Sequence, residues 1–296
     1  MQPRHIALAV VLSIVWGLNF VVIAVGLTGF PPLLLVALRL VVAGLPALFL
    51  PRPQLAWRVL FLISATLFIG QFGLFFSAMT LGMPPGIGSI VLQVQAFFTI
   101  GIAVAVLGER PTGAQIAGAA ITLAGLAVIA ATIGANGVTV TGLVLSVGSA
   151  LLWAIGNVLV RRVGAVDMLA LVSWLSLVSI LPMLVLAFAV EGPAAVTHAL
   201  THATWLTVGA ILYISLVSTT FGYAAWGQLL KIYPAAVVAP FSLLVPVSGT
   251  ISSALLLGET FGPLRLAGMA LIMAGLAVLV LRKRRPVSVA IAQPPP

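Results

Sequence analysis

The sequence predicts an all-α integral membrane protein with ten transmembrane helices. Hydrophobic residue types make up 62% of its 296 residues, and charged types only 6%. Because a soluble domain carries about 25% charged residues, this surface must face lipid. Ten apolar segments follow one another, each near the roughly 20 residues that a helix needs to cross a bilayer. They are 6–27, 32–50, 59–81, 85–107, 114–133, 141–160, 168–190, 205–228, 234–257 and 264–281.

Short, turn-like breaks separate these segments, and their prolines end one helix or begin the next. The first segment is a mainly apolar stretch of 22 residues. It exceeds the usual signal-peptide core of about 7–15 and lacks a clear cleavage site, so we expect it to be retained. The basic, proline-rich tail 282–296 is predicted to be disordered. The breaks include Pro31-Pro32, Pro51-Arg52-Pro53, Met83-Pro84-Pro85, Gly108-Glu109-Arg110-Pro111 and Asn136-Gly137.

The net charge of +9 is concentrated in the short loops between apolar segments. This distribution indicates orientation in a membrane rather than a nucleic-acid partner. With the N-terminus in the cytoplasm, eleven of the thirteen bases face inward, which predicts a multi-pass protein of the cell inner membrane with both termini cytoplasmic. The eleven are Arg4, Arg52, Arg58, Arg110, Arg161, Arg162, Lys231, Arg282, Lys283, Arg284 and Arg285.

The chain repeats itself after about half its length. Leu107–Ile129 and Leu257–Leu279 share eleven of 23 positions at a shift of 150 residues. Trp16 and Trp153 open the two halves at a shift of 137, and a longer loop near 191–204 accounts for the difference. The repeat predicts one five-helix unit over 5–133 and a second over 139–281. Five is odd, so the two units are inverted, a design typical of transporters that work by alternating access, although a duplication can also leave a repeat without functional symmetry.

Arg39 lies about seven residues into the second segment, roughly 10 Å below its outer end. Two interpretations stay open. The guanidinium faces a cavity and pairs with a substrate carboxylate, or it snorkels to the outer headgroups.

Polar and aromatic side chains recur inside the apolar segments of both halves. Neutral amides can bind a zwitterion without a permanent charge, or they can join helices by hydrogen bonds. Gly118, Gly125, Gly268 and Gly275 are spaced at seven residues within each half, and we expect them to pack helices closely. The polar and aromatic candidates are Trp16, Asn19, Gln93, Gln95, Trp153, Asn157, Tyr223 and Trp226.

The four acids, Glu109, Asp167, Glu191 and Glu259, all fall at segment ends or in loops. The chain therefore lacks the mid-membrane carboxylate that proton-coupled carriers commonly use. We expect Glu109 and Glu259 to cap the helix that follows each of them. Facilitated export, exchange and proton antiport all stay open.

Cysteine is absent, and no HExxH, Walker or GxSxG motif occurs. The sequence therefore predicts no enzyme, no cofactor and no metal site. His198 and His202 are four residues apart, and we expect them in a solvated loop rather than on a metal.

Several motifs are typical of one known family: Val15-Trp16-Gly17-Leu18-Asn19-Phe20, Ala37-Leu38-Arg39, Gly82-Met83-Pro84, the paired Gly-Glu turns and the runs 91–100 and 238–247. With them, the chain resembles the EamA family of the drug/metabolite transporter superfamily over about residues 5–281. The family implies a central cavity between two five-helix halves and export of amino-acid metabolites such as cysteine or O-acetylserine. The resemblance implies substrate contacts for the candidates above and Arg39, and we expect Pro84 and Pro234 to lie where the halves gate.

The sequence thus predicts an exporter of small amino-acid-like substrates. The first alternative is export of lipophilic cations or drugs, which would require a cavity carboxylate. The second is a non-transporting membrane scaffold, which would usually carry a soluble domain. The oligomeric state stays open, and a monomer is compatible with the sequence.

Overall fold

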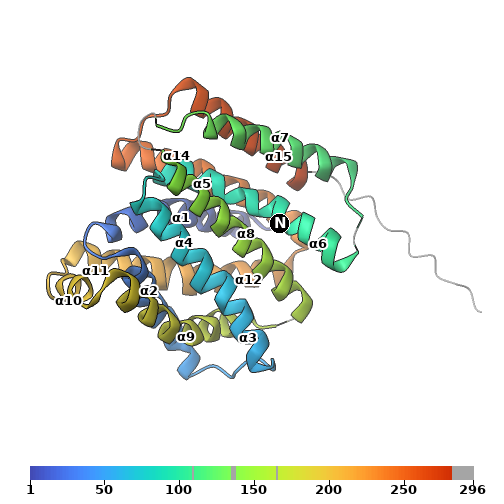
Figure 1. Cartoon of the computed structure of the whole chain (residues 1–296). Coiled ribbons are helices and arrows are strands. Elements are labelled where there is room, and N and C mark those ends of the chain that lie inside the picture. The colour runs from blue at the N-terminus through green and yellow to red at the C-terminus, as the bar shows by residue number, and fades with distance from the viewer. Residues whose placement is uncertain (109, 135–137, 165, 282–296) are drawn as a thin grey trace, which may run out of the picture.

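The protein is a bundle of membrane-spanning helices (Figure 1). The computed structural model describes residues 1–108, 110–134, 138–164 and 166–281. Within them, nine helical stretches of 18 to 28 residues are long and apolar enough to cross a membrane, and the shorter Pro32–Leu48 makes the tenth. The ten predicted spans are therefore confirmed. The predictions for Glu109, the Asn136-Gly137 turn and the tail fall outside the described residues.

Several spans consist of consecutive helical pieces, because short 3₁₀ or π-helical turns interrupt the regular α-helix. The π-helical turn η2 in the third span and η5 in the eighth occupy equivalent positions of the two halves, as do the 3₁₀ turns η3 and η6. In order, the spans are α1 (Pro3–Leu27); α2 (Pro32–Gly44) with η1 (Leu45–Leu48); α3 (Trp57–Ser64), η2 (Ala65–Gly70) and α4 (Gln71–Thr80); α5 (Pro85–Val91), η3 (Leu92–Val94) and α6 (Gln95–Leu107); α7 (Gly113–Ala130); α8 (Val140–Val163); α9 (Met168–Leu186) with η4 (Ala187–Glu191); α11 (Trp205–Leu212), η5 (Tyr213–Phe221) and α12 (Gly222–Ile232); α13 (Ala235–Val238), η6 (Ala239–Leu243) and α14 (Leu244–Leu257); and α15 (Pro263–Val280).

The fifth helix of each half packs against its counterpart, and α7 and α15 lie side by side at one edge of the bundle (Figure 1). A Cβ added to Gly125 would lie 2.7 Å from the Gly268 carbonyl oxygen, and one added to Gly118 would lie 2.9 Å from that of Gly275. The order of these pairs shows that the helices run antiparallel. The glycines are needed for this close approach, which confirms their predicted packing role.

The two halves interlock through the remaining helices. Helix α1 of the first half packs on α14 of the second, and α8 of the second packs on α6 of the first. The second helix of each half, α2 and α9, also pack on each other. Each half therefore completes the other, and the two inverted repeats interlock in one bundle.

The segment 191–204 is not the long loop that we expected. It contains the short helix α10 (Pro193–Thr201), in which a proline occupies the first turn after Gly192 at φ 86°. Proline is favoured at this position because its missing N–H would have no helical partner. His198 and His202 lie on this helix and at its end, and their rings stack at 4.1 Å between centroids.

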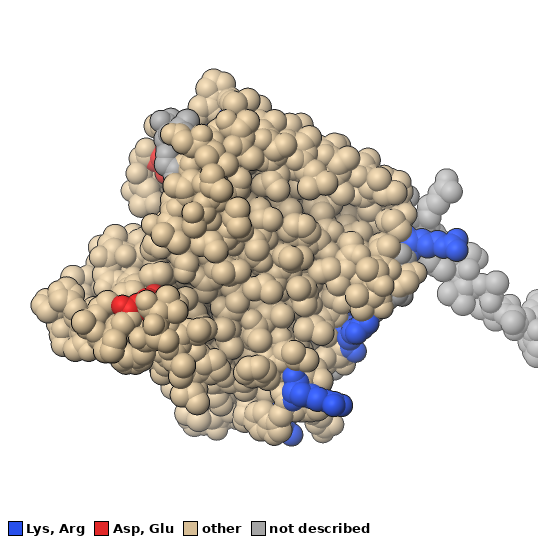
Figure 2. All heavy atoms as spheres, viewed as in Figure 1, with Lys and Arg blue, Asp and Glu red and all other residues tan. Residues whose placement is uncertain are grey.

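Most of the exposed charged side chains in view in Figure 2 lie near the ends of the bundle. On the face shown in Figure 2, the bases lie along one end and the acids at the opposite end. At the basic end, His5 Nδ1 lies 2.8 Å from the Tyr233 hydroxyl, and an Arg162 N–H donates to the Val106 carbonyl oxygen at 3.2 Å. This separation is what the positive-inside pattern of the sequence predicts.

The acidic end corrects the predicted role of Glu259. Its carboxylate accepts a hydrogen bond from the Gly86 backbone N–H at 3.1 Å, so it caps α5 of the other half rather than the helix that follows it. Glu191 likewise accepts from the backbone N–H groups of Leu33 and Leu34 at the start of α2. The positive ends of these helix dipoles favour a carboxylate. The prediction was wrong because it assigned Glu259 to α15, the next helix in the sequence. In the fold, the start of α5 lies closer to the Glu259 carboxylate.

Candidate functional site

The side chain of Arg39 is buried inside the bundle and packs against two aromatic rings. Its side chain is 4% exposed, and Cζ lies 3.9 Å from the centroid of the Phe72 ring and 5.9 Å from that of Phe76. Its Nη2 and Nε donate to Thr219 Oγ1 at 2.9 and 3.2 Å. In this structure the guanidinium therefore lies inside the bundle and not among the outer headgroups.

The π-helical turn η5 holds Arg39 in this position. Ser215 Oγ donates to the Arg39 carbonyl oxygen at 3.1 Å, and Thr219 Oγ1 donates to the Ile214 carbonyl oxygen five residues earlier at 2.7 Å. A π-helical turn shifts side-chain directions relative to a regular α-helix and often occurs at functional sites. The distortion thus presents a hydroxyl of the second half to a cation of the first.

Three of the predicted aromatic residues form one cluster beside this turn. The Trp16 ring lies 5.2 Å from Trp226 and 5.9 Å from Tyr223, between ring centroids. Trp16 Nε1 donates to the Ser218 carbonyl oxygen at 2.9 Å, which anchors α1 to η5. Tyr223 also lies close enough to Arg39 for an electrostatic interaction. The cluster and the cation therefore belong to one region between the halves.

Two of the predicted amides meet across the other contact between the halves. Asn157 Nδ2 of α8 donates to Gln95 Oε1 of α6 at 2.9 Å. Thr99 Oγ1 donates to the Gln95 carbonyl oxygen one turn away at 2.8 Å. Gln95 and Asn157 are only half-buried. Their amides thus retain capacity for further hydrogen bonds.

The remaining candidate residues belong neither to the aromatic cluster nor to the pair of amides. Asn19 is 9% exposed, and its Oδ1 has no hydrogen-bond partner among the described residues. Gln93 lies half-buried in η3, and Trp153 packs against the main apolar core. Pro84 precedes α5 next to the Glu259 cap, whereas Pro234 precedes α13 next to Tyr233. The two prolines therefore lie at opposite ends of the bundle.

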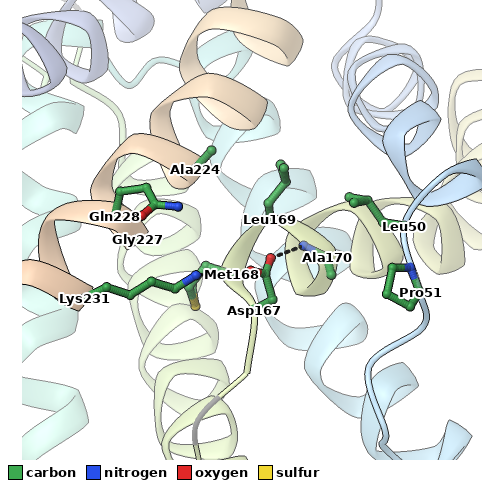
Figure 3. Close-up of a pocket in the computed structure, with 10 residues that line it drawn as sticks. All are labelled: Leu50, Pro51, Asp167, Met168, Leu169, Ala170, Ala224, Gly227, Gln228 and Lys231. Atoms are coloured by element: carbon green, nitrogen blue, oxygen red, sulfur yellow. Dashed lines mark hydrogen bonds and ion pairs between the residues drawn. The ribbon is translucent and has the colours of Figure 1, made fainter.

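Two cavities lie at the ends of the bundle, and none of the predicted site residues lines them. An open groove of about 310 Å³ at the acidic end runs along the 27–32 turn, Thr80 and α10. A cavity of about 340 Å³ lies at the basic end (Figure 3). Its lining residues are Leu50, Pro51, Asp167, Met168, Leu169, Ala170, Ala224, Gly227, Gln228 and Lys231.

The sequence-based prediction missed Thr219, Phe72 and Phe76 as neighbours of Arg39. The two phenylalanines are four residues apart, so they share one helix face, but nothing in their spacing points to a cation. Thr219 depends on the π-helical turn, which has no sequence pattern that we recognise. The prediction also missed the ion pair between Asp167 and Lys231, because these residues are 64 positions apart in the sequence.

Comparisons with known proteins agree with this architecture. The model of the EamA-like transporter family matches residues 4–131 and 140–281. A "Probable amino-acid metabolite efflux pump" of Salmonella typhimurium is 41% identical over 92% of this chain and 93% of its own length, and one of Escherichia coli is 40% identical over 98% and 99%. A "Probable terminal-alkyne amino-acid exporter" of Streptantibioticus cattleyicolor is 27% identical over 92% of each chain.

A solved crystal structure has the same fold. It aligns with a TM-score of 0.64 at 20% sequence identity and covers 95% of this chain and 98% of its own. The family match extends over both halves of the chain. The two efflux pumps, at 41% and 40% identity, align over nearly their full lengths. The ten spans and the interlocked inverted halves fit the same assignment. The chain is therefore a multi-pass membrane protein that belongs to the EamA-like transporter family.

Proposed function

We propose that this chain exports small amino-acid metabolites across the cell inner membrane by alternating access, with both termini in the cytoplasm. The observation that carries the proposal is the buried guanidinium of Arg39, which donates to the neutral hydroxyl of Thr219 and packs against the rings of Phe72 and Phe76. The names of the relatives at about 40% identity support the same substrate class.

A buried cation that has no acidic partner among the described residues favours an anionic ligand. Placing an Arg within a span costs on the order of 2.5–3.5 kcal/mol at the bilayer centre. Thr219 and Phe72 offset part of this cost but supply no negative charge. A substrate carboxylate would supply it through charge-assisted hydrogen bonds, which are about twice as strong as neutral ones.

The amides complete a site for a zwitterion. Gln93, Gln95 and Asn157 are half-buried within spans, where an amide that faces lipid would lose hydrogen bonds that an aqueous space provides. The unpartnered Oδ1 of buried Asn19 is an acceptor for a substrate ammonium. Trp16, Trp153, Tyr223 and Trp226 would enclose the apolar part of the substrate, as aromatic side chains commonly do.

The inverted halves provide the two states that export requires. Two similar units in opposite orientation have two packings of similar energy, one open to each side of the membrane. Pro84 and Pro234 begin equivalent helices at opposite ends, and we assign them to the two gates.

Export of lipophilic cations is the second candidate, and the distribution of acids disfavours it. Such a substrate would require a carboxylate in the interior, whereas Asp167, Glu191 and Glu259 all lie at helix ends. The aromatic cluster around Trp16 is the one observation that favours it, through cation–π attraction.

Transport by proteoliposomes tests the proposal. We expect purified protein to accelerate efflux of at least one labelled amino acid, such as cysteine, O-acetylserine or leucine, over protein-free liposomes. Equal rates for the whole panel would refute this substrate class. Faster efflux of a lipophilic cation instead would support the second candidate. Collapsing an imposed proton gradient separates proton antiport from facilitated export.

A further inference from the structure

The cavity of about 340 Å³ at the basic end combines apolar walls with one acid and one base. Leu50 and Pro51 after α2, Met168 and Leu169 at the start of α9, and Ala224 of α12 supply most of the apolar lining. Asp167 and Lys231 stand on two different elements at its edge (Figure 3). The space is large enough for a small metabolite, since ligand pockets are typically about 300–1,000 Å³.

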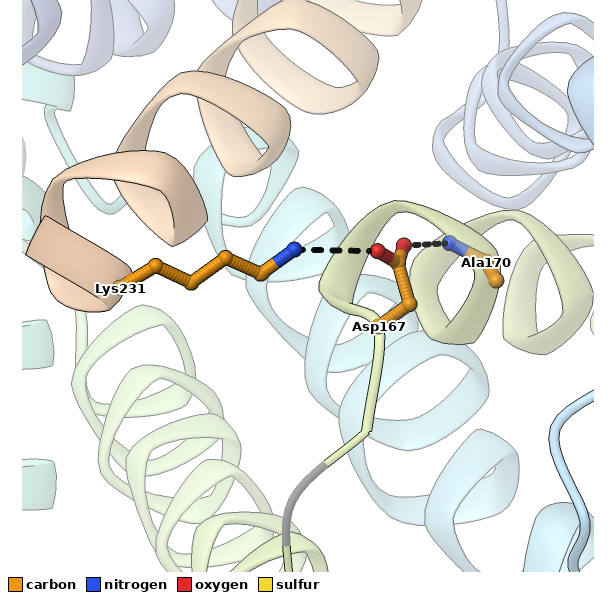
Figure 4. A network of polar contacts seen from close by, with 3 residues as sticks. All are labelled: Asp167, Ala170 and Lys231. Atoms are coloured by element: carbon orange, nitrogen blue, oxygen red, sulfur yellow. Dashed lines mark hydrogen bonds and ion pairs between the residues drawn. The ribbon is translucent and has the colours of Figure 1, made fainter.

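The two charges form an exposed pair that a ligand can replace. Lys231 Nζ lies 3.3 Å from Asp167 Oδ2, and the side chains are 55% and 56% exposed (Figure 4). Such exposed pairs contribute little to stability, typically well below the strength of a desolvated pair. Opening it therefore costs little.

Asp167 is the fixed member of the pair. Its Oδ1 accepts a hydrogen bond from the Ala170 backbone N–H at 3.0 Å and caps α9. This backbone hydrogen bond, together with the smaller effect of Lys231, holds the pKa of the Asp167 carboxyl below its ordinary value. The carboxylate is thus ionised at neutral pH, whereas the long Lys231 side chain is free to reorient.

We infer that this cavity binds free zwitterionic amino acids with an apolar side chain, as an entry site on the cytoplasmic face. The substrate ammonium pairs with Asp167, its carboxylate pairs with Lys231, and its side chain lies against Met168 and Leu169. Gln228 on the same face of α12 offers a further amide. The inference rests on the proposed function. It specifies the substrate class and the first site that binds the molecule before export.

An ethanolamine phospholipid headgroup carries the same pair of charges. Asp167 and Lys231 are both exposed at the end of the bundle, where a free molecule from the cytoplasm reaches them directly, whereas a lipid reaches them only from the headgroup layer. The experiment therefore compares nanodiscs of phosphatidylcholine and phosphatidylglycerol with nanodiscs that also contain phosphatidylethanolamine.

Competition binding tests the inference separately from transport. Labelled leucine bound to the full-length protein is displaced by leucine, by N-acetylleucine, which lacks the ammonium, and by leucine methyl ester, which lacks the carboxylate. We expect both derivatives to compete about tenfold less well in the unsubstituted protein. Asp167→Asn should abolish the discrimination against N-acetylleucine, and Lys231→Gln the discrimination against the methyl ester. Asn still caps a helix, so Asp167→Asn preserves the fold.

The control Arg4→Gln removes one exposed base from the same end and should leave both discriminations unchanged. Unaltered discrimination in both cavity variants would overturn the inference. Leucine binding that weakens with phosphatidylethanolamine in the unsubstituted protein, but not in the two variants, would also overturn it in favour of a lipid. Binding of this pattern without efflux from proteoliposomes would contradict the proposed function but not the site. Efflux with unaltered discrimination would contradict only the site.

Discussion

The guanidinium of Arg39 joins the two inverted halves through Thr219 Oγ1, 2.9 Å from Nη2. The cation belongs to the second span of the first half, and the hydroxyl belongs to a π-helical turn of the second. Phe72 covers the guanidinium on one side at 3.9 Å. A change in how the halves pack must therefore alter the surroundings of this cation.

Replacing Arg39 tests its role in substrate binding. We expect Arg39→Gln to lower kcat/KM for export by about 10- to 100-fold, because a hydrogen bond to a charged group contributes about 1.5–3 kcal/mol. Arg39→Lys keeps the charge but loses the planar fork, so it should retain part of the activity. Initial rates of uptake into inverted vesicles, normalised to the amount of folded protein, measure the effect.

Arg58→Gln is the matched control, because it removes an exposed base outside the candidate site. It should leave export unchanged. Normal export by Arg39→Gln at normal expression would contradict a role in substrate binding.

The contact between α7 and α15 predicts a sharp difference between two Gly→Ala substitutions. A methyl group at Gly125 would lie 2.7 Å from the Gly268 carbonyl oxygen, whereas one at Gly101 meets nothing within 4 Å. We expect Gly125→Ala to destabilise the protein by about 1–3 kcal/mol through overpacking. Gly101→Ala should be neutral or stabilising by up to about 1 kcal/mol. Thermal unfolding in detergent measures both, and equal midpoints would refute the packing role.

The Glu259 cap predicts a pH-dependent contribution to stability. Burial raises the pKa of the Glu259 carboxyl above its ordinary value of 4.5, despite the hydrogen bond that the carboxylate accepts from the Gly86 backbone N–H. Its contribution is then fully present below about pH 4.5 and is lost as the pH rises through the folded-state pKa. Between pH 4 and 7, the unfolding midpoint of the unsubstituted protein should therefore fall relative to that of Glu259→Gln. A relative rise would mean that the charged form is the one that the α5 start stabilises.

The hydrogen bond between Gln95 and Asn157 predicts non-additive effects on export. We expect Gln95→Leu and Asn157→Leu each to lower kcat/KM, and the double variant to lose less than the sum of the two in free energy. Residues in direct contact show coupling energies of about 0.5–3 kcal/mol. The comparison is a double-mutant cycle that combines Gln93→Leu with Asn157→Leu. Gln93 is two residues from Gln95, but the hydrogen bond of Asn157 goes to Gln95. Full additivity for Gln95 and Asn157 would show that the hydrogen bond has no role in export.

Much of the fold could be predicted, because lipid imposes length and polarity on every span. The ten spans follow from apolar runs of about 20 residues, and the inverted halves from a repeat at a shift of 150. Less of the site could be predicted. Arg39, Trp16, Asn157 and Gln95 stand out because polar or bulky residues inside a span are rare, but their partners depend on contacts between distant helices.

The sequence by itself determined the membrane class, the number of crossings, the inversion and the candidate polar residues, because hydropathy and charge act locally along the chain. The tertiary structure decided which residues meet. It placed Glu259 on α5 rather than on its own following helix, and Arg39 on Thr219 rather than at the headgroups. It also created the cavity that Asp167 and Lys231 line. These pairings arise where inverted helices cross and where π-helical turns redirect side chains. The residues of a single span specify neither the crossings nor the partners that the turned side chains meet.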